Sequence, residues 1–180
     1  MQSLSYQTHN RISLVYGMLA EMSRGAKGIY DTSIGPDLAQ SWETAADGLT
    51  WTFRLRPGLL WSNGEPLTAG HFVASWQRVL NPAVAAEGAG YLYVIRNAED
   101  YNAGRLKDFS AVGVAAPDER TLLVKLAHPV PYLAALAALP SWYPINPRCL
   151  AKFGALDQHG ANWTRPGNLV GNGEIGRAHV

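Results

Sequence analysis

The side chains best suited to acid–base or metal chemistry are five histidines, and their spacing does not form a site. His9, His71, His128, His159 and His179 stand far apart, and none belongs to an HxH or HExxH pattern of the kind that binds zinc. The sequence also has no Gly-Lys-Ser/Thr phosphate loop, no GxGxxG turn after a predicted strand and no GxSxG nucleophile motif. We therefore predict that the protein is not an enzyme and that it uses no metal and no cofactor.

Two acidic pairs and one cysteine are the remaining candidates for catalysis. Glu99 and Asp100 are adjacent, as are Asp118 and Glu119, and neighbouring side chains usually point apart instead of converging on one substrate atom. We interpret both pairs as solvated turn faces. Cys149 is the single cysteine, so it cannot form an intramolecular disulfide, and we interpret it as a small buried apolar residue instead of a nucleophile.

The aromatic residues raise a second possibility, a binding surface for sugars or bases. Trp51, Phe53, Phe72 and Trp76 lie on the apolar faces of predicted elements, which favours packing in the core. A stand-alone interaction or carbohydrate-binding module stays open as an alternative, and it would require exposed aromatic side chains on one face. A hydrolase would need a convergent pair of titratable groups, for which the sequence offers no candidate.

Composition narrows the class of protein and its partners. The chain has 180 residues, of which 47% are hydrophobic and 16% charged, as in soluble globular proteins. The 15 Lys and Arg residues and the 14 Asp and Glu residues give a formal net charge of +1, so no long-range field would gather nucleic acid. No apolar run reaches the roughly 18 residues of a membrane helix.

Hydrophobic periodicity predicts the elements that would carry these side chains. Helical spacing is seen at residues 12–22 and 129–139, and strict alternation predicts a strand at residues 50–56. A turn at Asp47 and Gly48 could join that strand to the segment around Trp42 in a hairpin. At Trp42 we expect a short strand or a helical turn. A second hairpin is expected from residues 110–116 and 121–126.

The clearest helix is predicted at residues 69–80. Thr68 is placed to cap its N-terminus, and Asn81 with Pro82 should end it. Residues 140–147 are expected to form an irregular return. The order of helices and antiparallel hairpins indicates an α+β fold instead of a doubly wound parallel sheet.

One long segment resembles a known family. Residues 51–82, WTFRLRPGLLWSNGEPLTAGHFVASWQRVLNP, are similar to the oligopeptide-binding proteins of solute-binding family 5, the peptide and nickel family of ABC-type importers. Shorter pieces agree in order: PDLAQSWE at 36–43, VGV at 112–114, the hairpin at 118–126, HPVPY at 128–132 and NWTRPGNLVGNG at 162–173. The resemblance extends over residues 4–173, which is nearly the whole chain.

The resemblance implies the N-terminal part of a periplasmic-binding-protein-like fold (type II, cluster C), with a mixed or antiparallel sheet and packed helices. Such a protein captures oligopeptides outside the cytoplasm and delivers them to the membrane permease of an ABC importer. We therefore expect a monomer that is periplasmic, or extracellular and lipid-anchored, although a signal peptide is not visible in this sequence. Nickel complexes or another small solute stay open as the cargo.

The resemblance also divides the chain. Residues 1–35 would begin a ligand-binding lobe, 36–145 would form a subdomain specific to the family, and 146–173 would return to the ligand-binding lobe, whose other half would follow this chain. The last seven residues, EIGRAHV at 174–180, match the translation of a common sequencing adapter, so we expect a non-native tail there.

Ligand contacts are carried over from the family to three residues. The segment ahead of the first helix supplies contacts in family members, and it falls here at His9, Asn10 and Arg11. Family members often have a tyrosine near the position of Gly88 that reaches the cleft, and this chain lacks it. At His71 the usual acidic residue is missing, which removes a favourable charge near a helix N-terminus.

Overall fold

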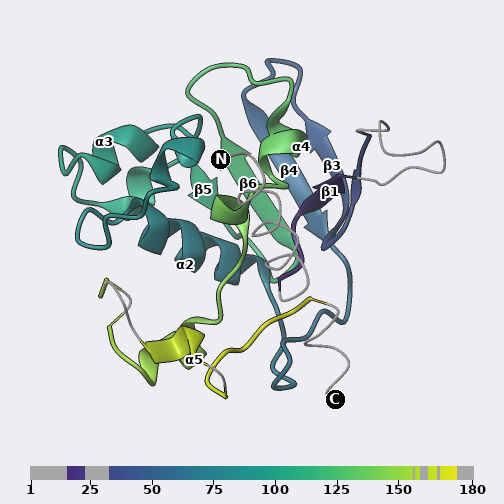
Figure 1. Cartoon of the computed structure of the whole chain (residues 1–180). Coiled ribbons are helices and arrows are strands. Elements are labelled where there is room, and N and C mark those ends of the chain that lie inside the picture. Colours follow the sequence, from purple (N-terminus) through teal and green to yellow (C-terminus); the bar gives the residue numbers. More distant parts are fainter. Residues whose placement is uncertain (1–15, 23–32, 156, 159–161, 166, 174–180) are drawn as a thin grey trace, which may run out of the picture.

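Two antiparallel sheets organise the chain in the computed structural model, which describes residues 16–22, 33–155, 157–158, 162–165 and 167–173 (Figure 1). The larger sheet has four strands in the order β3 (Ala39–Thr44), β4 (Thr50–Leu55), β6 (Thr121–Lys125) and β5 (Val114–Ala115). The smaller sheet pairs β1 (Ala20–Met22) with β2 (Ile34–Pro36). Antiparallel sheets with separate helices confirm the predicted α+β class.

The strand predicted at residues 50–56 forms β4, and its alternation sets the inner face of the sheet. Trp51 and Phe53 are buried, and they lie opposite Val124 and Leu122 of β6. The predicted hairpin with the Trp42 segment is confirmed as β3–β4. Its turn passes through Gly48 at φ +69°, a left-handed conformation that glycine adopts without a steric penalty.

Helix α2 (Ala69–Leu80) covers this apolar face and has the bounds that the sequence predicts. Phe72, Trp76 and Leu80 are fully buried on its inner side. Removing a large apolar side chain of this kind from water stabilises a fold by about 1.5–3 kcal/mol. The interpretation of the tryptophans as core residues is therefore confirmed.

The other helical segments within the described residues are short. Three have a regular α-helical turn, namely α3 (Ala98–Asn102), α4 (Leu133–Leu136) and α5 (Pro147–Ala151). Four are single turns of 3₁₀ helix, namely η1 (Ala89–Leu92), η2 (Phe109–Ala111), η3 (Pro140–Trp142) and η4 (Asn162–Thr164). In Figure 1, α5 lies beyond one side of α2, away from the large sheet.

The helix predicted at residues 12–22 is wrong at its C-terminal end, where residues 20–22 form β1. Met18, Leu19 and Ala20 are consecutive and all buried, so the apolar spacing that indicated a helix also suits an extended segment buried on both sides. Pairing with β2 decides between the two, and local spacing cannot reveal that pairing. Residues 12–15 lie outside the described residues.

Two further predictions are wrong in extent. The helix expected at 129–139 is only the single turn α4, which begins later than predicted. On its C-terminal side the helix cannot continue, because Pro140 keeps Leu139 extended at φ −90° and ψ 153°. The hairpin expected from 110–116 pairs only at β5. Ahead of it the chain turns at η2, where the carboxylate of Asp108 accepts hydrogen bonds from the backbone N–H and hydroxyl of Ser110.

Candidate ligand-binding region

The three residues predicted to contact a peptide, His9, Asn10 and Arg11, lie outside the described residues. The structure does define the backbone just after them. The backbone N–H of Gly17 donates to Oδ1 of Asn172 at 3.2 Å, and that of Met18 donates to Oδ2 of Asp37 at 2.6 Å. These bonds hold the start of the described chain against two segments that are distant in sequence.

Two tyrosines pack together at this junction. The ring of Tyr16 stacks against that of Tyr143, with centroids 6.0 Å apart and an interplanar angle of 24°. Burial raises the pKa of the Tyr143 phenol to about 12, with a smaller contribution from Asp37, and burial also raises the pKa of Tyr16. Both phenols are therefore neutral near pH 7, and their rings belong to a small buried cluster with Met18 and Ala138.

Gly88 lies near the position at which family members often have a tyrosine that reaches the cleft. A Cβ atom at this position would collide with the hydroxyl of Ser141, so η1 and η3 approach each other closely here. A side chain could be accommodated only if Ser141 turned away. The structure therefore places the hydroxyl of Ser141, and no open space, beside Gly88.

His71 has a role that the sequence analysis missed. Its Nδ1 atom accepts the backbone N–H of Thr68 at 3.0 Å and the indole N–H of Trp61 at 3.3 Å. The first turn of α2 has no acidic residue, as predicted, but the imidazole replaces an acid as hydrogen-bond acceptor in a capping box. Burial lowers the pKa of His71, although the carboxylate of Glu65 acts in the opposite direction.

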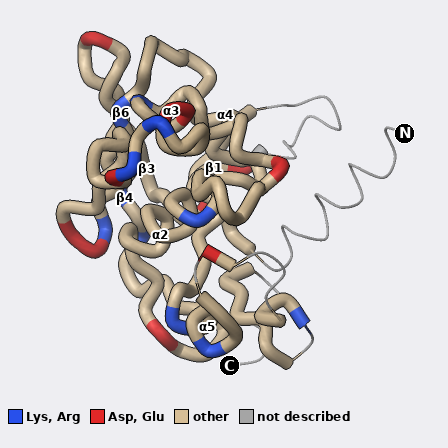
Figure 2. The backbone as a smooth tube through the Cα atoms, turned by 90° about the vertical axis from the view of Figure 1, so that its left-hand side faces the viewer, with Lys and Arg blue, Asp and Glu red and all other residues tan. Residues whose placement is uncertain are grey.

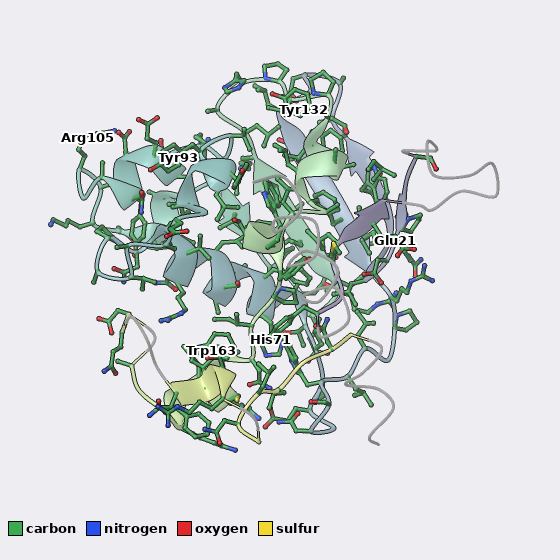
Figure 3. All side chains as sticks on the ribbon, in the orientation of Figure 1. Glu21, His71, Tyr93, Arg105, Tyr132 and Trp163 are labelled. Carbon is green, nitrogen blue, oxygen red and sulfur yellow. The ribbon has the colours of Figure 1, made fainter. Side chains whose placement is uncertain are left out.

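Both acidic pairs are exposed, as the sequence predicts, but Glu99 and Asp100 lie in the first turn of α3 and not in a turn between elements. Asp100 accepts a hydrogen bond from Nε of Arg105 at 2.7 Å, and Glu99 lies 3.9 Å from the same guanidinium group at the surface (Figure 3). Asp118 caps its turn by accepting the N–H of Arg120. Both acidic pairs are solvated.

Cys149 is buried, and its thiol donates to the carbonyl of Asn168 at 3.2 Å. Burial raises the pKa of this thiol, which keeps it protonated and unreactive. Across the described residues, His, Cys, Asp and Glu side chains do not gather in any group of three that could hold a metal ion. The helices of the same part of the chain are also too short or too polar to cross a membrane.

One surface hollow lies between α2 and the segment that follows α5. It has a volume of about 190 Å³ and is lined by Ala74, Gln77, Arg78, Asn81 and Asp157. Pockets for small ligands usually measure about 300–1,000 Å³. The hollow is therefore too small for a peptide.

Comparison with known proteins identifies the family. Residues 33–174 match the model of the bacterial extracellular solute-binding proteins, family 5 middle region. This match covers most of the chain, and the protein belongs to this family. The resemblance that the sequence indicated is confirmed.

Individual relatives agree with this assignment. The chain is 42% identical over 142 residues to the probable deoxycholate-binding periplasmic protein YgiS of Escherichia coli, covering 78% of this chain and 25% of the relative. It is 36% identical over 162 residues to the periplasmic oligopeptide-binding protein OppA of Haemophilus influenzae, covering 89% and 27%. The chain thus spans about a quarter of the length of these curated relatives.

Solved structures show the same fold. The crystal structure of Haemophilus influenzae OppA in complex with the peptide RPPGFSPFR matches with a TM-score of 0.81 at 34% identity, over 92% of this chain and 30% of that one. The unliganded open form of the murein tripeptide-binding protein MppA matches with a TM-score of 0.79 at 32% identity, over 91% and 29%. The predicted periplasmic-binding-protein-like fold is confirmed.

Proposed function

We propose that this chain is part of an extracytoplasmic solute-binding protein that captures oligopeptides and delivers them to an ABC importer. The observation that carries the proposal is the likeness to the peptide complex of Haemophilus influenzae OppA, which extends over 92% of this chain. The buried positions of Trp51, Trp61 and Trp76 argue against the alternative of a sugar-binding module that uses exposed aromatics. In this role the protein performs no catalysis and works as a periplasmic or lipid-anchored monomer beside its permease.

The division of the chain follows the same proposal. The four-stranded sheet and α2 all fall within residues 36–145, the proposed family-specific subdomain. Residues 1–35 and 146–173 are proposed to belong together to a ligand-binding lobe. The bond between Gly17 and Asn172, which joins positions 155 residues apart, supports that grouping.

The proposal assigns the peptide contacts to His9, Asn10 and Arg11. Extended peptides are held mainly through their main chain, so the selectivity for peptide side chains is expected to be broad. A second ligand class is suggested by the relative with 42% identity, whose name refers to deoxycholate.

The test is made on the full-length parent protein, by thermal unfolding with di- to octapeptides or with deoxycholate. Peptides at about 100 times their Kd should stabilise the folded state by about 2.7 kcal/mol, which is visible as a rise in Tm. Asn10→Ala should raise the peptide Kd by about two- to tenfold, the value of one hydrogen bond. His128→Ala, at an exposed position of the middle subdomain, is the control. A rise in Tm with deoxycholate and none with any peptide would contradict the proposal.

A further inference from the structure

A tight turn at residues 61–65, called here the Trp61 turn, precedes α2 in the sequence. It is hydrogen-bonded to two segments that come much later in the chain, around Asn146 and Gly171. The indole of Trp61 is 1% exposed, and the backbone N–H of Trp61 donates to the carbonyl of Glu65 at 2.9 Å. Next to it, the backbone N–H of Ser62 donates to the carbonyl of Gly171 at 2.8 Å. In return, the backbone N–H of Gly171 donates to the hydroxyl of Ser62 at 3.2 Å. The turn therefore holds the segment around Gly171.

The same turn also holds α5. The carboxylate of Glu65 accepts a hydrogen bond from Nδ2 of Asn146 at 2.7 Å. Oδ1 of Asn146 caps α5 by accepting the backbone N–H of Cys149 at 2.9 Å, and the thiol of Cys149 reaches Asn168. Residues 146–171 are thus joined to the Trp61 turn at both ends.

His71 connects the Trp61 turn to α2. Its Nδ1 atom accepts two N–H donors at once, from Thr68 and Trp61, so Nδ1 carries no proton and the neutral ring is protonated at Nε2. A proton added to Nδ1 would face two donors and break both hydrogen bonds. Because Trp61 is buried, its indole N–H would then have no acceptor, a state that costs free energy.

We propose that His71 makes the attachment of residues 146–171 to α2 sensitive to mild acid. Figure 3 shows His71 at the point where α2 faces the α5 segment. This inference goes beyond peptide capture and does not depend on it.

Several charged groups surround His71, and they act in different directions. Glu65, from the Trp61 turn, favours the protonated imidazole, and Arg148 of α5 disfavours it. The hydrogen bond from Asn146 is the main cause that lowers the pKa of Glu65, and Arg148 and Lys152 contribute less. Burial is the main cause that raises the pKa of the neighbouring Cys149 thiol, and Glu65 adds to it. Figure 2 shows Lys and Arg segments on and beside α5. Burial of the ring is the largest effect, and it lowers the pKa of His71 below 6.5.

The sign of the pH effect follows from this direction. Below pH 6.5 the unfolded chain takes up a proton at His71 that the folded chain does not bind, so stability falls with falling pH until the folded-state pKa is passed. Above pH 6.5 the contribution is complete. From pH 7.5 to 5.5 one such group raises the unfolding equilibrium constant by up to about tenfold.

The experiment measures urea unfolding of the full chain at pH 7.5 and 5.5. His71→Gln keeps an oxygen acceptor that does not titrate, and His128→Gln makes the same exchange at an exposed site. Between pH 7.5 and 5.5, the unfolding equilibrium constant should rise by the same factor in the wild type and in His128→Gln. In His71→Gln the rise should be smaller, by a factor of up to about ten. An equal loss in all three proteins would overturn the proposal.

A second measurement covers the case in which His71→Gln does not fold. In the wild type, the ¹⁵N spectrum of the imidazole at pH 7.5 should show an unprotonated Nδ1, and the ring should titrate below pH 6.5. Amide exchange at Gly171 and Cys149, corrected for the intrinsic pH dependence, should accelerate at pH 5.5 relative to Phe53 of β4. A protonated Nδ1 at pH 7.5, or a titration at or above pH 6.5, would refute the inference.

Discussion

Ser75 offers a direct test of how α2 holds the segment that leads to α5. Its hydroxyl donates to the backbone carbonyl of Tyr143 at 2.6 Å, and the two residues are only 3% and 6% exposed. In Ser75→Ala the cavity is small, so the main loss is the hydrogen bond. The carbonyl of Tyr143 would be left buried without this donor.

The expected cost follows from that burial. A net hydrogen bond contributes about 0.5–1.5 kcal/mol, and a buried acceptor left without a donor costs about 1–3 kcal/mol. We therefore expect Ser75→Ala to lower the free energy of unfolding by about 1–3 kcal/mol. For a chain of this length each 1 kcal/mol corresponds to a Tm shift of roughly 2–4 °C.

Ser110 provides a matched control, because its hydroxyl makes a bond of the same length, 2.6 Å, to the carboxylate of Asp108 at an exposed site. Urea unfolding followed by tryptophan fluorescence and circular dichroism would compare Ser75→Ala with Ser110→Ala. Water can replace the lost partner at Ser110, so its variant should lose only a small fraction of the stability lost at Ser75. Equal losses in the two variants would refute the reasoning that burial sets the cost.

Two glycine substitutions should differ in outcome although both meet a close neighbour. In Gly113→Ala the new Cβ collides with the backbone carbonyl oxygen of Lys125, which cannot move without breaking its hydrogen bond from the N–H of Arg96, so unfolding experiments should show a loss of about 1–3 kcal/mol. In Gly88→Ala the neighbour is the hydroxyl of Ser141, which can rotate, and the stability should stay within about 1 kcal/mol of the parent. A more costly change at Gly88 than at Gly113 would contradict this distinction between side chain and backbone.

The sequence predicts an element well where its apolar periodicity and its local start and stop residues indicate the same element. Helix α2 has apolar residues at helical spacing, an N-cap at Thr68 and a stop at Pro82, and its predicted bounds are confirmed. Strand β4 has strict alternation. By contrast, β1 depends on pairing with β2, across residues 23–32, and its own apolar residues suit a helix equally well.

The contacts around the candidate region could not be predicted in the same way. Glu65 meets Asn146 across 81 positions, and each residue taken alone is an ordinary polar residue of a turn or cap. His71 is a similar case. Its position three residues after Thr68 could have suggested a capping box, but a neutral histidine in place of the usual Glu or Gln gives a weak signal.

Helix α2 therefore serves two purposes along its length. Its middle turn is fixed in the core, where Ser75 and Trp76 donate to the consecutive carbonyls of Tyr143 and Trp142. Its first turn is fixed through His71 to the Trp61 turn. These attachments hold the chain just before α5 and, through the turn, the segment just after it. Because the Trp61 turn holds both Asn146 and Gly171, a weakening at the first turn of α2 would loosen both ends of residues 146–171, while the core bonds of the middle turn keep Trp142 and Tyr143 in place.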